Sequence, residues 1–314
     1  PVFGPPLAVI ADLAVAGGSI AAQSPWIAAH AAPWPGELLV LEREGESAFS
    51  LNRRVGAPAI MGELLDGLPR GPVDLFDRAS GVRVKLYSGA LASLSEEELL
   101  AGANIAAIGD DDSGWEIVQF RDAVLVAAST FRIAWLLRGR GGSEPEIAPS
   151  RPAGSRFMLL DPSVVQLDTR LGDIGVEKGW RIGPATRDHG DPAYVEISHV
   201  ASGIGLRPLS PVHLRGWRDG GDVVFSWTRR TRIDGDGWEL AEVPLGEERE
   251  AYDVEVLSGG AAVRTVAVQE PRFRYSLSEQ AADFGTPPST FTLRIFQLSA
   301  VFGRGAPLEA TVKP

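Results

Sequence analysis

Apolar and polar positions alternate most clearly within residues 114–142. One face of an extended segment there would carry large apolar side chains: Phe131, Ile133, Trp135 and Leu137. The opposite face would carry Arg132, Ala134 and Arg138. A period of two over this length predicts a half-buried β-strand. Leu136 interrupts the polar face, so we expect a neighbouring segment to cover part of it.

Two more strands are predicted just before this one, at residues 115–120 and 123–126. The chain would turn at Asp122 and again at residues 128–130, which gives a ribbon of three short antiparallel strands. A group of glycines that ends at Gly142 closes the ribbon, because glycine adopts backbone angles that do not continue a strand.

Earlier in the chain, short apolar runs alternate with turn residues. Strands are predicted at residues 26–29, 38–43, 47–51, 73–76, 82–87 and 105–108. Hairpin turns would lie at Glu44–Glu46 and at Asp77–Gly81, and residues 60–65 favour one or two turns of helix. A short helix is predicted at residues 96–101, because Ser95 and Glu98 form a capping box.

Composition divides the chain into four regions. We expect a β-rich domain at residues 1–142, a linker at 143–155, a small β segment at 156–207 that completes or adjoins the first domain, and a separate domain at 208–314. Residues 143–155 are rich in Pro, Ser and charge, which favours a linker. Strands are predicted in the small β segment at residues 157–160, 164–167, 180–182 and 194–200.

Strand-length runs recur at even spacing in the last region. They lie at residues 212–216, 223–228, 252–257, 262–268, 272–276, 291–298 and 308–312. Seven short strands in about 100 residues is the count of a β-sandwich. With Trp227, Tyr252 and the Gly-rich Phe302–Gly305, the pattern resembles a fibronectin type III domain, in which a core Trp and a core Tyr pack between the sheets. The polar excursion at residues 229–250 departs from that family.

Several stretches carry a second resemblance. A Trp-Glu-x-x-Gln-Phe strand (residues 115–120) leads to Leu-Leu-Arg-Gly-x-x-Gly (136–142), and further distinctive stretches are residues 205–216, 224–235 and 244–256. Together they resemble the C-terminal part of tail-tip hub proteins of long-tailed bacteriophages. The host-specificity ("megatron") proteins of gene transfer agents have the most similar pattern, and the resemblance is most specific after residue 114.

This resemblance implies a mainly β structural protein of a phage-like tail tip (baseplate hub or central fibre), acting in particle assembly and host-envelope attachment. It implies a homotrimer that contacts other tail or baseplate proteins and a host surface glycan or envelope receptor. The particle would be assembled in the bacterial cytoplasm. We expect no enzyme activity, no cofactor and no metal. Two alternatives stay open: a glycan-degrading, tail-associated hydrolase, and an extracellular binding module unrelated to phages.

Composition narrows the classes of function. A net charge of −11 and a pI near 5.0 argue against a protein that wraps nucleic acid, although a tail component need not touch the DNA that it delivers. The sequence contains no cysteine, which excludes disulfides, Cys-ligated zinc and iron–sulfur clusters. Glycine (36) and proline (23) exceed their usual combined share of about 12%, which favours many turns.

The start of the chain gives no targeting signal. Leu7–Ala16 is the longest apolar run there, but Asp12 interrupts it and it is too short to span a bilayer. No basic region precedes it, so we expect neither a membrane span nor a signal peptide. Because the sequence begins at Pro1 without methionine, we expect it to be a piece of a longer protein.

Motifs for catalysis or metal binding are weak. Asp110–Gly114 and Asp234–Gly237 lack the ligand spacing of an EF-hand, so turns are favoured over calcium loops. No His-Glu-x-x-His, Gly-x-Ser-x-Gly or phosphate-loop motif is present, and Gly139–Gly142 is too short for a dinucleotide fingerprint. A zinc site or Ser-His-Asp triad built from distant positions stays open. The isolated histidines are His30, His189, His199 and His213.

A dense basic run at residues 229–232 is the clearest candidate contact surface. Planar guanidinium groups would suit an acidic glycan or a neighbouring subunit, and the alternative is a solvated loop balanced by nearby glutamates. Trp217 and Trp238 could stack on sugars, although core or interface positions are favoured. The candidate contacts are Arg229, Arg230, Arg232, Trp238 and Arg304. A hydrolase would need two carboxylates about 5 or 6.5–9.5 Å apart, and the 41 acidic residues offer no choice between pairs.

Overall fold

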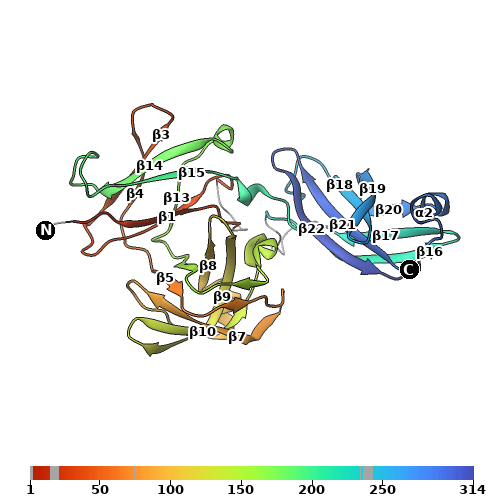
Figure 1. Ribbon diagram of the computed structural model, residues 1–314, viewed down its shortest axis with the longest axis horizontal. Coiled ribbons are helices and arrows are strands. Elements are labelled where there is room, and N and C mark those ends of the chain that lie inside the picture. Colours follow the sequence, from red (N-terminus) through yellow and green to blue (C-terminus); the bar gives the residue numbers. More distant parts are fainter. Residues whose placement is uncertain (1–2, 15–20, 74, 234, 236–242) are drawn as a thin grey trace. The chain divides into compact units, whose positions relative to one another are not determined.

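The protein is mainly β and divides into two compact units (Figure 1). The computed structural model describes residues 3–14, 21–73, 75–233, 235 and 243–314. Strands contain 49% of the residues and helices 8%. One unit ends at Gly205 and the other begins at Leu206. In the described chain, neither α-helix has the length and apolar character needed to cross a bilayer.

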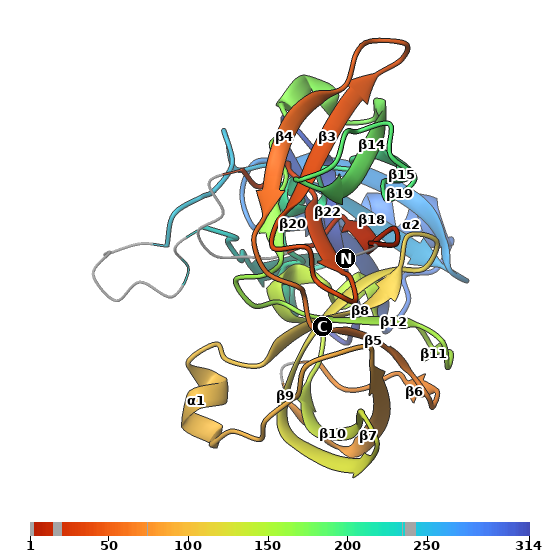
Figure 2. The same cartoon turned by 90° about the vertical axis from the view of Figure 1, so that its left-hand side faces the viewer.

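Six strands of the N-terminal unit close into an antiparallel barrel, in the order β10-β7-β5-β12-β8-β9 (Figure 2). The strands are β5 (Met61–Leu64), β7 (Phe76–Leu86), β8 (Ile105–Asp110), β9 (Gly114–Ala127), β10 (Thr130–Leu137) and β12 (Arg156–Leu159). Alternate side chains point inward, and Val84, Val118 and Phe157 are among those that fill the interior. The barrel therefore encloses a packed core, as expected for so few strands.

Two more sheets of the same unit are built from segments on both sides of the barrel in the sequence. One contains β1 (Leu7–Ala11), β2 (Trp26–His30) and β13 (Val165–Gln166). The other contains β15 (Val195–Val200), β14 (Glu177–Pro184), β3 (Leu38–Glu44) and β4 (Ser50–Val55). A two-stranded pair joins β6 (Leu68–Pro69) and β11 (Ser150–Arg151). The barrel is thus an insertion between β4 and β13.

The three-stranded sheet lies between the barrel and the four-stranded sheet. Val9 and Ala28 on one face share a core with Met158 on the outside of the barrel. Ile10 on the opposite face shares a core with Trp180 of β14. Because successive residues of a strand point to opposite faces, β1 can serve both cores.

Two of the expected elements in the barrel are different in the structure. Residues 60–65, for which composition favours a helix, contain strand β5, because β7 and β12 pair with it on its two sides and override local preference. No turn occurs at Asp122, which lies within β9 in register with Ala134 of β10. The predicted ribbon of three short strands is therefore two long ones.

The expected hairpin at Asp77–Gly81 is a bulge inside β7. Gly81 pairs with Ala134 of β10, and Asp77 pairs with Leu136, so β7 has more residues between these two pairs than β10 has. The Asp77 carboxylate accepts the backbone N–H of Ser80 at 2.9 Å within the bulge. The turn-forming residues Asp77–Gly81 therefore form a bulge, and the chain does not reverse direction there.

The predicted faces of β10 are wrong from Trp135 onward. Trp135 has a left-handed φ of 54°, and the register of β10 shifts beside it. This left-handed residue turns Leu136 into the barrel core and leaves Trp135 half-buried at the outer surface. Its ring lies 4.3 Å from the guanidinium of Arg78 and 3.5 Å from that of Arg121. A large residue with positive φ is a backbone outlier, and the residues around Trp135 contain no signal that predicts it.

Two expectations near the barrel have opposite outcomes. Helix α1 (Glu96–Leu100) is confirmed, and both hydrogen bonds of the capping box between Ser95 and Glu98 are present. Residues 143–155 are not a linker. Ser143 and Arg151 are buried there, and the segment contains a 3-10 turn at Glu144–Glu146.

The C-terminal unit is a β-sandwich with the strand order of a fibronectin type III domain. One sheet contains β16 (Val212–Asp219), β17 (Asp222–Thr228) and β20 (Arg272–Tyr275). The other contains β19 (Ala261–Val268), β18 (Tyr252–Ser258), β21 (Phe291–Ser299) and β22 (Gly303–Val312). Trp227 and Tyr252 meet edge to face in its core, with ring centroids 5.2 Å apart, as the resemblance to fibronectin type III domains implies.

One helix of the sandwich was not expected from the sequence. Helix α2 (Leu277–Phe284) follows β20, and Ser276 and Glu279 form its capping box. Phe284 at the end of this helix packs on Phe291 of the core, with ring centroids 6.1 Å apart. The Ser-x-x-Glu pattern that marks this helix was available in the sequence.

Candidate functional site

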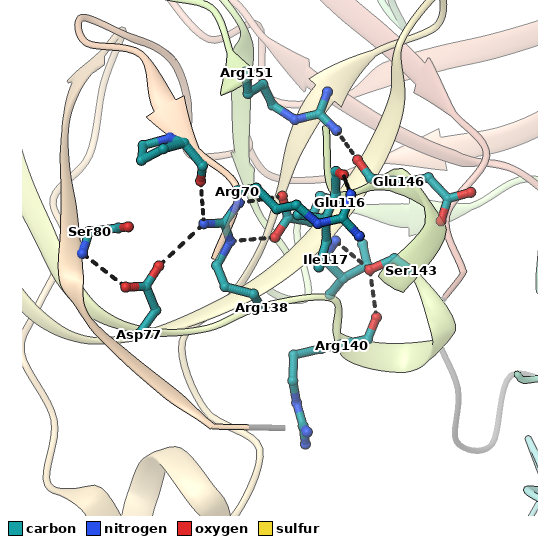
Figure 3. A network of polar contacts seen from close by, with 12 residues as sticks. Arg70, Asp77, Ser80, Glu116, Ile117, Arg138, Arg140, Ser143, Glu146 and Arg151 are labelled. Carbon is teal, nitrogen blue, oxygen red and sulfur yellow. Dashed lines mark hydrogen bonds and ion pairs between the residues drawn. The ribbon is translucent and has the colours of Figure 1, made fainter. Parts of the chain in front are cut away.

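A cluster of buried charged side chains occupies one end of the barrel (Figure 3). Arg138 follows β10, and its Nε and Nη2 donate to the two carboxylate oxygens of Glu116 at 2.5 and 2.8 Å. Its Nη1 donates to the carbonyl of Pro69 at 3.0 Å and to Asp77 at 3.4 Å. All three charged side chains are almost completely shielded from solvent.

The strand geometry places these charges together. Glu116 has the same parity along β9 as Val118 and Phe120, which face the interior, so β9 directs its carboxylate inward. The left-handed backbone of Trp135 turns Arg138 toward the same space, and Asp77 enters from the start of β7. Three strands therefore converge on one ion-pair cluster.

A second buried arginine ties the segment after β10 to the β8–β9 turn. Arg151 is 1% exposed, and its Nη1 donates to Ser113 Oγ at 2.9 Å and to the carbonyl of Gly114 at 3.0 Å. Its Nη2 donates to the carbonyl of Glu146 at 2.6 Å. Burial lowers the pKa of the Arg151 guanidinium. Ser143 Oγ also accepts a backbone N–H of β9 at 2.8 Å, so this segment caps the barrel end.

This cluster fits a structural role and not a reaction centre. Both oxygens of Glu116 accept hydrogen bonds from Arg138, and neither group reaches solvent. A buried ion pair gives modest net stability, whereas removal of one partner leaves an uncompensated charge in the core. The cluster therefore fixes the relative positions of the strands that supply it.

A groove of about 400 Å³ in the N-terminal unit is a polar site that is more accessible to solvent than the buried cluster. It lies where the chain after β1, the β8–β9 turn and the end of β15 come together. Three acidic residues, a histidine, an indole and two serines are among its lining residues: Asp12, Asp111, Glu146, His199, Trp115, Ser198 and Ser202. Asp12 Oδ2 lies 3.2 Å from His199 Nε2 and accepts the backbone N–H of Ser202 at 3.1 Å. Asp111 accepts Trp115 Nε1–H at 3.2 Å.

The groove is the place where a hydrolase active site could lie, but its residues form neither a catalytic triad nor a metal site. Within the described ranges, no serine hydroxyl hydrogen-bonds to His199, so the contacts of Asp12 do not extend into a Ser-His-Asp triad. The same ranges contain no group of three or more His, Asp or Glu residues able to hold a metal ion. The Asp110–Gly114 sequence forms a turn, in which Asp110 accepts the backbone N–H of Asp112 at 3.1 Å and of Ser113 at 2.7 Å.

Residues of the basic run make contacts inside the loop between β17 and β18. Arg229 donates to the carbonyl of Pro244 at 2.7 Å, and Arg232 pairs with the largely buried Glu247 at 3.1 Å. Arg230 also takes part in an interaction. These contacts brace the loop, and binding of a glycan or partner by the run stays a prediction.

The remaining candidate contacts lie elsewhere. Arg304 of β22 pairs with Asp253 and Glu255 at 2.7 Å each, and its guanidinium lies 4.6 Å from the ring centroid of Phe296. Trp217 of β16 is 41% exposed. Trp238 lies outside the described residues.

The buried cluster was missed in the sequence, although one signal for it was present. Glu116 occupies an inward position of an apolar strand, and a charge there requires a partner. The partner was hidden because regular alternation along β10 places Arg138 on the outer face. The left-handed backbone at Trp135 that reverses this has no signal in the sequence. Arg151 lay in a stretch whose composition resembles a linker.

Residues 59–158 match the model of a protein family described as "Rcc01698-like, C-terminal", a name associated with gene transfer agents. The match covers less than half of the chain. Its limits nearly coincide with those of the barrel, whose first strand in the sequence begins at Met61 and whose last ends at Leu159. The matched region is therefore one complete folded element.

Two solved structures share a weak likeness with the chain. Domains d3-d4 of the rat CD45 extracellular region are 13% identical with a TM-score of 0.26, and the match covers 49% of this chain and 72% of that one. The FN5 domain of Drosophila Lar is 16% identical with a TM-score of 0.21, over 34% and 95% of the two chains. No curated protein matches the sequence.

Proposed function

We propose that this chain is a structural component of a phage-like tail tip that acts in particle assembly and host-envelope attachment, without catalysis of its own. One observation carries the proposal: the match to a gene-transfer-agent-associated family coincides with the closed barrel. That barrel has a filled interior and a buried ion-pair cluster at one end. These are properties of a rigid building block.

The rest of the chain suits the same role. The barrel and the sandwich are rigid supports from which loops can meet partners. A net charge of −11 is compatible with a particle component that does not bind the packaged DNA. From the resemblance, the proposal includes a homotrimer about the tail axis, other tail proteins as neighbours, and a location at the tail tip of a particle assembled in the bacterial cytoplasm.

A producing strain allows a direct test. Deletion of the gene should give particles that lack a complete tail tip and fail to adsorb to host cells, and the wild-type gene supplied in trans should restore both. Mass spectrometry of purified wild-type particles should detect this chain. Normal particles from the deletion strain, or wild-type particles without the chain, would contradict the proposal.

The acidic groove supports a glycan-degrading hydrolase as the second candidate function. Asp12 is its best-positioned carboxylate, because His199 and the backbone N–H of Ser202 orient it. Purified chain would be incubated with host capsule, and released reducing sugar would be measured. Release that is steady in the wild type and absent in Asp12→Asn and heat-treated samples would establish the hydrolase. No release from any sample would leave the structural role in place.

A further inference from the structure

The tip of the β9–β10 hairpin presents an uninterrupted run of exposed, uncharged residues. Residues 124–129, Val-Leu-Val-Ala-Ala-Ser, are all exposed. The exposed fractions are 57% for Val124, 62% for Leu125 and 48% for Val126. In a barrel strand every second side chain would turn inward, so this hairpin extends past the end of the packed interior. Several consecutive exposed apolar residues are unfavourable in water unless they serve a contact.

The tip is a regular hairpin held by the neighbouring strand. Thr130 pairs with Ala127 across the turn, and Ser129 has the left-handed φ of 50° that the turn uses. The Ser129 carbonyl accepts the backbone N–H of Leu86 at the end of β7, at 2.8 Å. The exposed side chains are therefore displayed on a defined backbone.

Two basic side chains lie directly beside the apolar tip. Lys85 Nζ donates to the carbonyl of Ala128 at 3.3 Å, which places its ammonium group at the turn. Arg132 of β10 lies in register with Val124, so both belong to the outer face. Among the ion pairs of the described chain, none includes Lys85 or Arg132.

The acidic residues on this part of the barrel have arginine partners of their own. Asp66 pairs with Arg83 at 2.6 Å. Asp122 pairs with Arg121 at 2.8 Å and also interacts electrostatically with Arg132. The four cations Lys85, Arg83, Arg121 and Arg132 outnumber Asp66 and Asp122 there, which gives a local excess of positive charge in a chain whose net charge is −11.

Glu63 of β5 also lies close to these cations. It lies in register with Lys85 on one side and with Arg156 of β12 on the other. A single carboxylate between two cations does not cancel the positive charge around the tip.

We propose that the tip of the β9–β10 hairpin inserts into the headgroup region of a bilayer that contains anionic phospholipid. Val124, Leu125 and Val126 would enter the apolar zone, while Lys85 and Arg132 would meet the lipid phosphates. Charge favours a bilayer over a second copy of this tip as the contacted surface. Two tips in contact would bring their basic residues together, whereas an anionic bilayer complements both the apolar residues and the basic side chains. The inference rests on the proposed role at the host envelope and names the surface contacted.

Vesicle binding by the full chain tests this inference. Co-sedimentation would use phosphatidylcholine vesicles with and without phosphatidylglycerol, at low and high salt. The wild type should bind the anionic vesicles, and binding should weaken with salt. In the triple variant Val124→Ser, Leu125→Ser, Val126→Ser, the affinity for anionic vesicles should fall by about tenfold or more. The double variant Leu75→Ser, Leu100→Ser, at positions 66% and 64% exposed, should bind like the wild type.

A charge variant, Lys85→Gln with Arg132→Gln, keeps the apolar tip and should lose the preference for anionic vesicles. Circular dichroism would check that each variant is folded. Equal binding by the triple variant and its control, or by neutral and anionic vesicles, would overturn the inference. A change in oligomeric mass of the triple variant without a change in vesicle binding would also overturn it and indicate self-contact. Vesicle binding can fail while the chain is found in particles, so the two proposals fail separately.

Discussion

Arg138 and Glu116 form a two-point ion pair, at 2.5 and 2.8 Å, in which the side chains are 1% and 0% exposed. The two residues come from adjacent parts of the barrel wall, and Asp77 approaches the same guanidinium from β7. Displacement of any of the three strands would leave a bare charge in an apolar core. We therefore expect the pair to make the barrel's register specific, while its net contribution to stability is modest.

Removal of the buried cation should destabilise the barrel strongly. Arg138→Met leaves the Glu116 and Asp77 carboxylates without their partner, and loss of one member of a buried pair costs about 3–5 kcal/mol. Urea unfolding of the full chain would measure the change in the free energy of unfolding. Arg83→Met, which removes the partner of the partly exposed Asp66, is the matched control and should have a far smaller effect. Equal effects would contradict a structural role for the cluster.

A methyl group added at Gly71 should disturb the buried ion-pair cluster of Arg138, Glu116 and Asp77. A Cβ at this position would lie 2.4 Å from Asp77 Oδ2 and 2.8 Å from Arg138 Nη1. Gly71→Ala should therefore lower the free energy of unfolding by about 1–3 kcal/mol, the range for overpacking. Gly56→Ala is the control, because no atom lies within 4 Å of its added Cβ, and its effect should stay within about 0.5 kcal/mol. Thermal unfolding of both variants would check this, and similar behaviour would contradict the geometry.

Asp66 should titrate at unusually low pH. The hydrogen bond from the Arg83 guanidinium holds the pKa of its carboxyl at about 2, below the ordinary 3.8. Because the folded-state pKa is depressed, the pair contributes stability that is present well above pH 3.8 and is lost as the pH falls toward 2. An NMR titration of the carboxyl carbon should show this midpoint, and Arg83→Gln should raise it toward 3.8. An unchanged midpoint in the variant would mean that the pair does not form in solution.

The sandwich should depend on Trp227 far more than on Trp217. Trp227 is 4% exposed and packs edge to face on Tyr252, so Trp227→Ala should cost about 3–5 kcal/mol in unfolding free energy. Trp217 is 41% exposed on β16, and Trp217→Ala should change little. Denaturant unfolding followed by circular dichroism would compare them. If the two variants were equally stable, the core described for this unit would be wrong.

Local sequence signals predicted the elements that depend on neighbouring residues. The capping box of Ser95 and Glu98 located α1 because both of its hydrogen bonds join residues three apart. The core pair Trp227 and Tyr252 could be expected because the strand pattern around them resembles a fibronectin type III domain, in which a Trp and a Tyr pack between the sheets. The β-rich class of both units followed from such runs.

Features that depend on distant contacts could not be predicted in this way. Strand β5 is a strand because β7 and β12 pair with it, and nothing within residues 61–64 signals those partners. Trp135 lies opposite the bulge of β7, and its left-handed backbone reverses the side on which Arg138 lies. The buried cluster and the groove around Asp12 both combine residues far apart in the sequence. Their assembly is a property of the closed fold.

The central claim places this chain in the tail tip of a phage-like particle. A cryo-electron microscopy map of purified particles tests it most directly. The account predicts density at the end of the tail into which the six-stranded barrel and the sandwich fit as separate bodies, repeated about the tail axis. A complete tail tip whose density accommodates neither unit would contradict it.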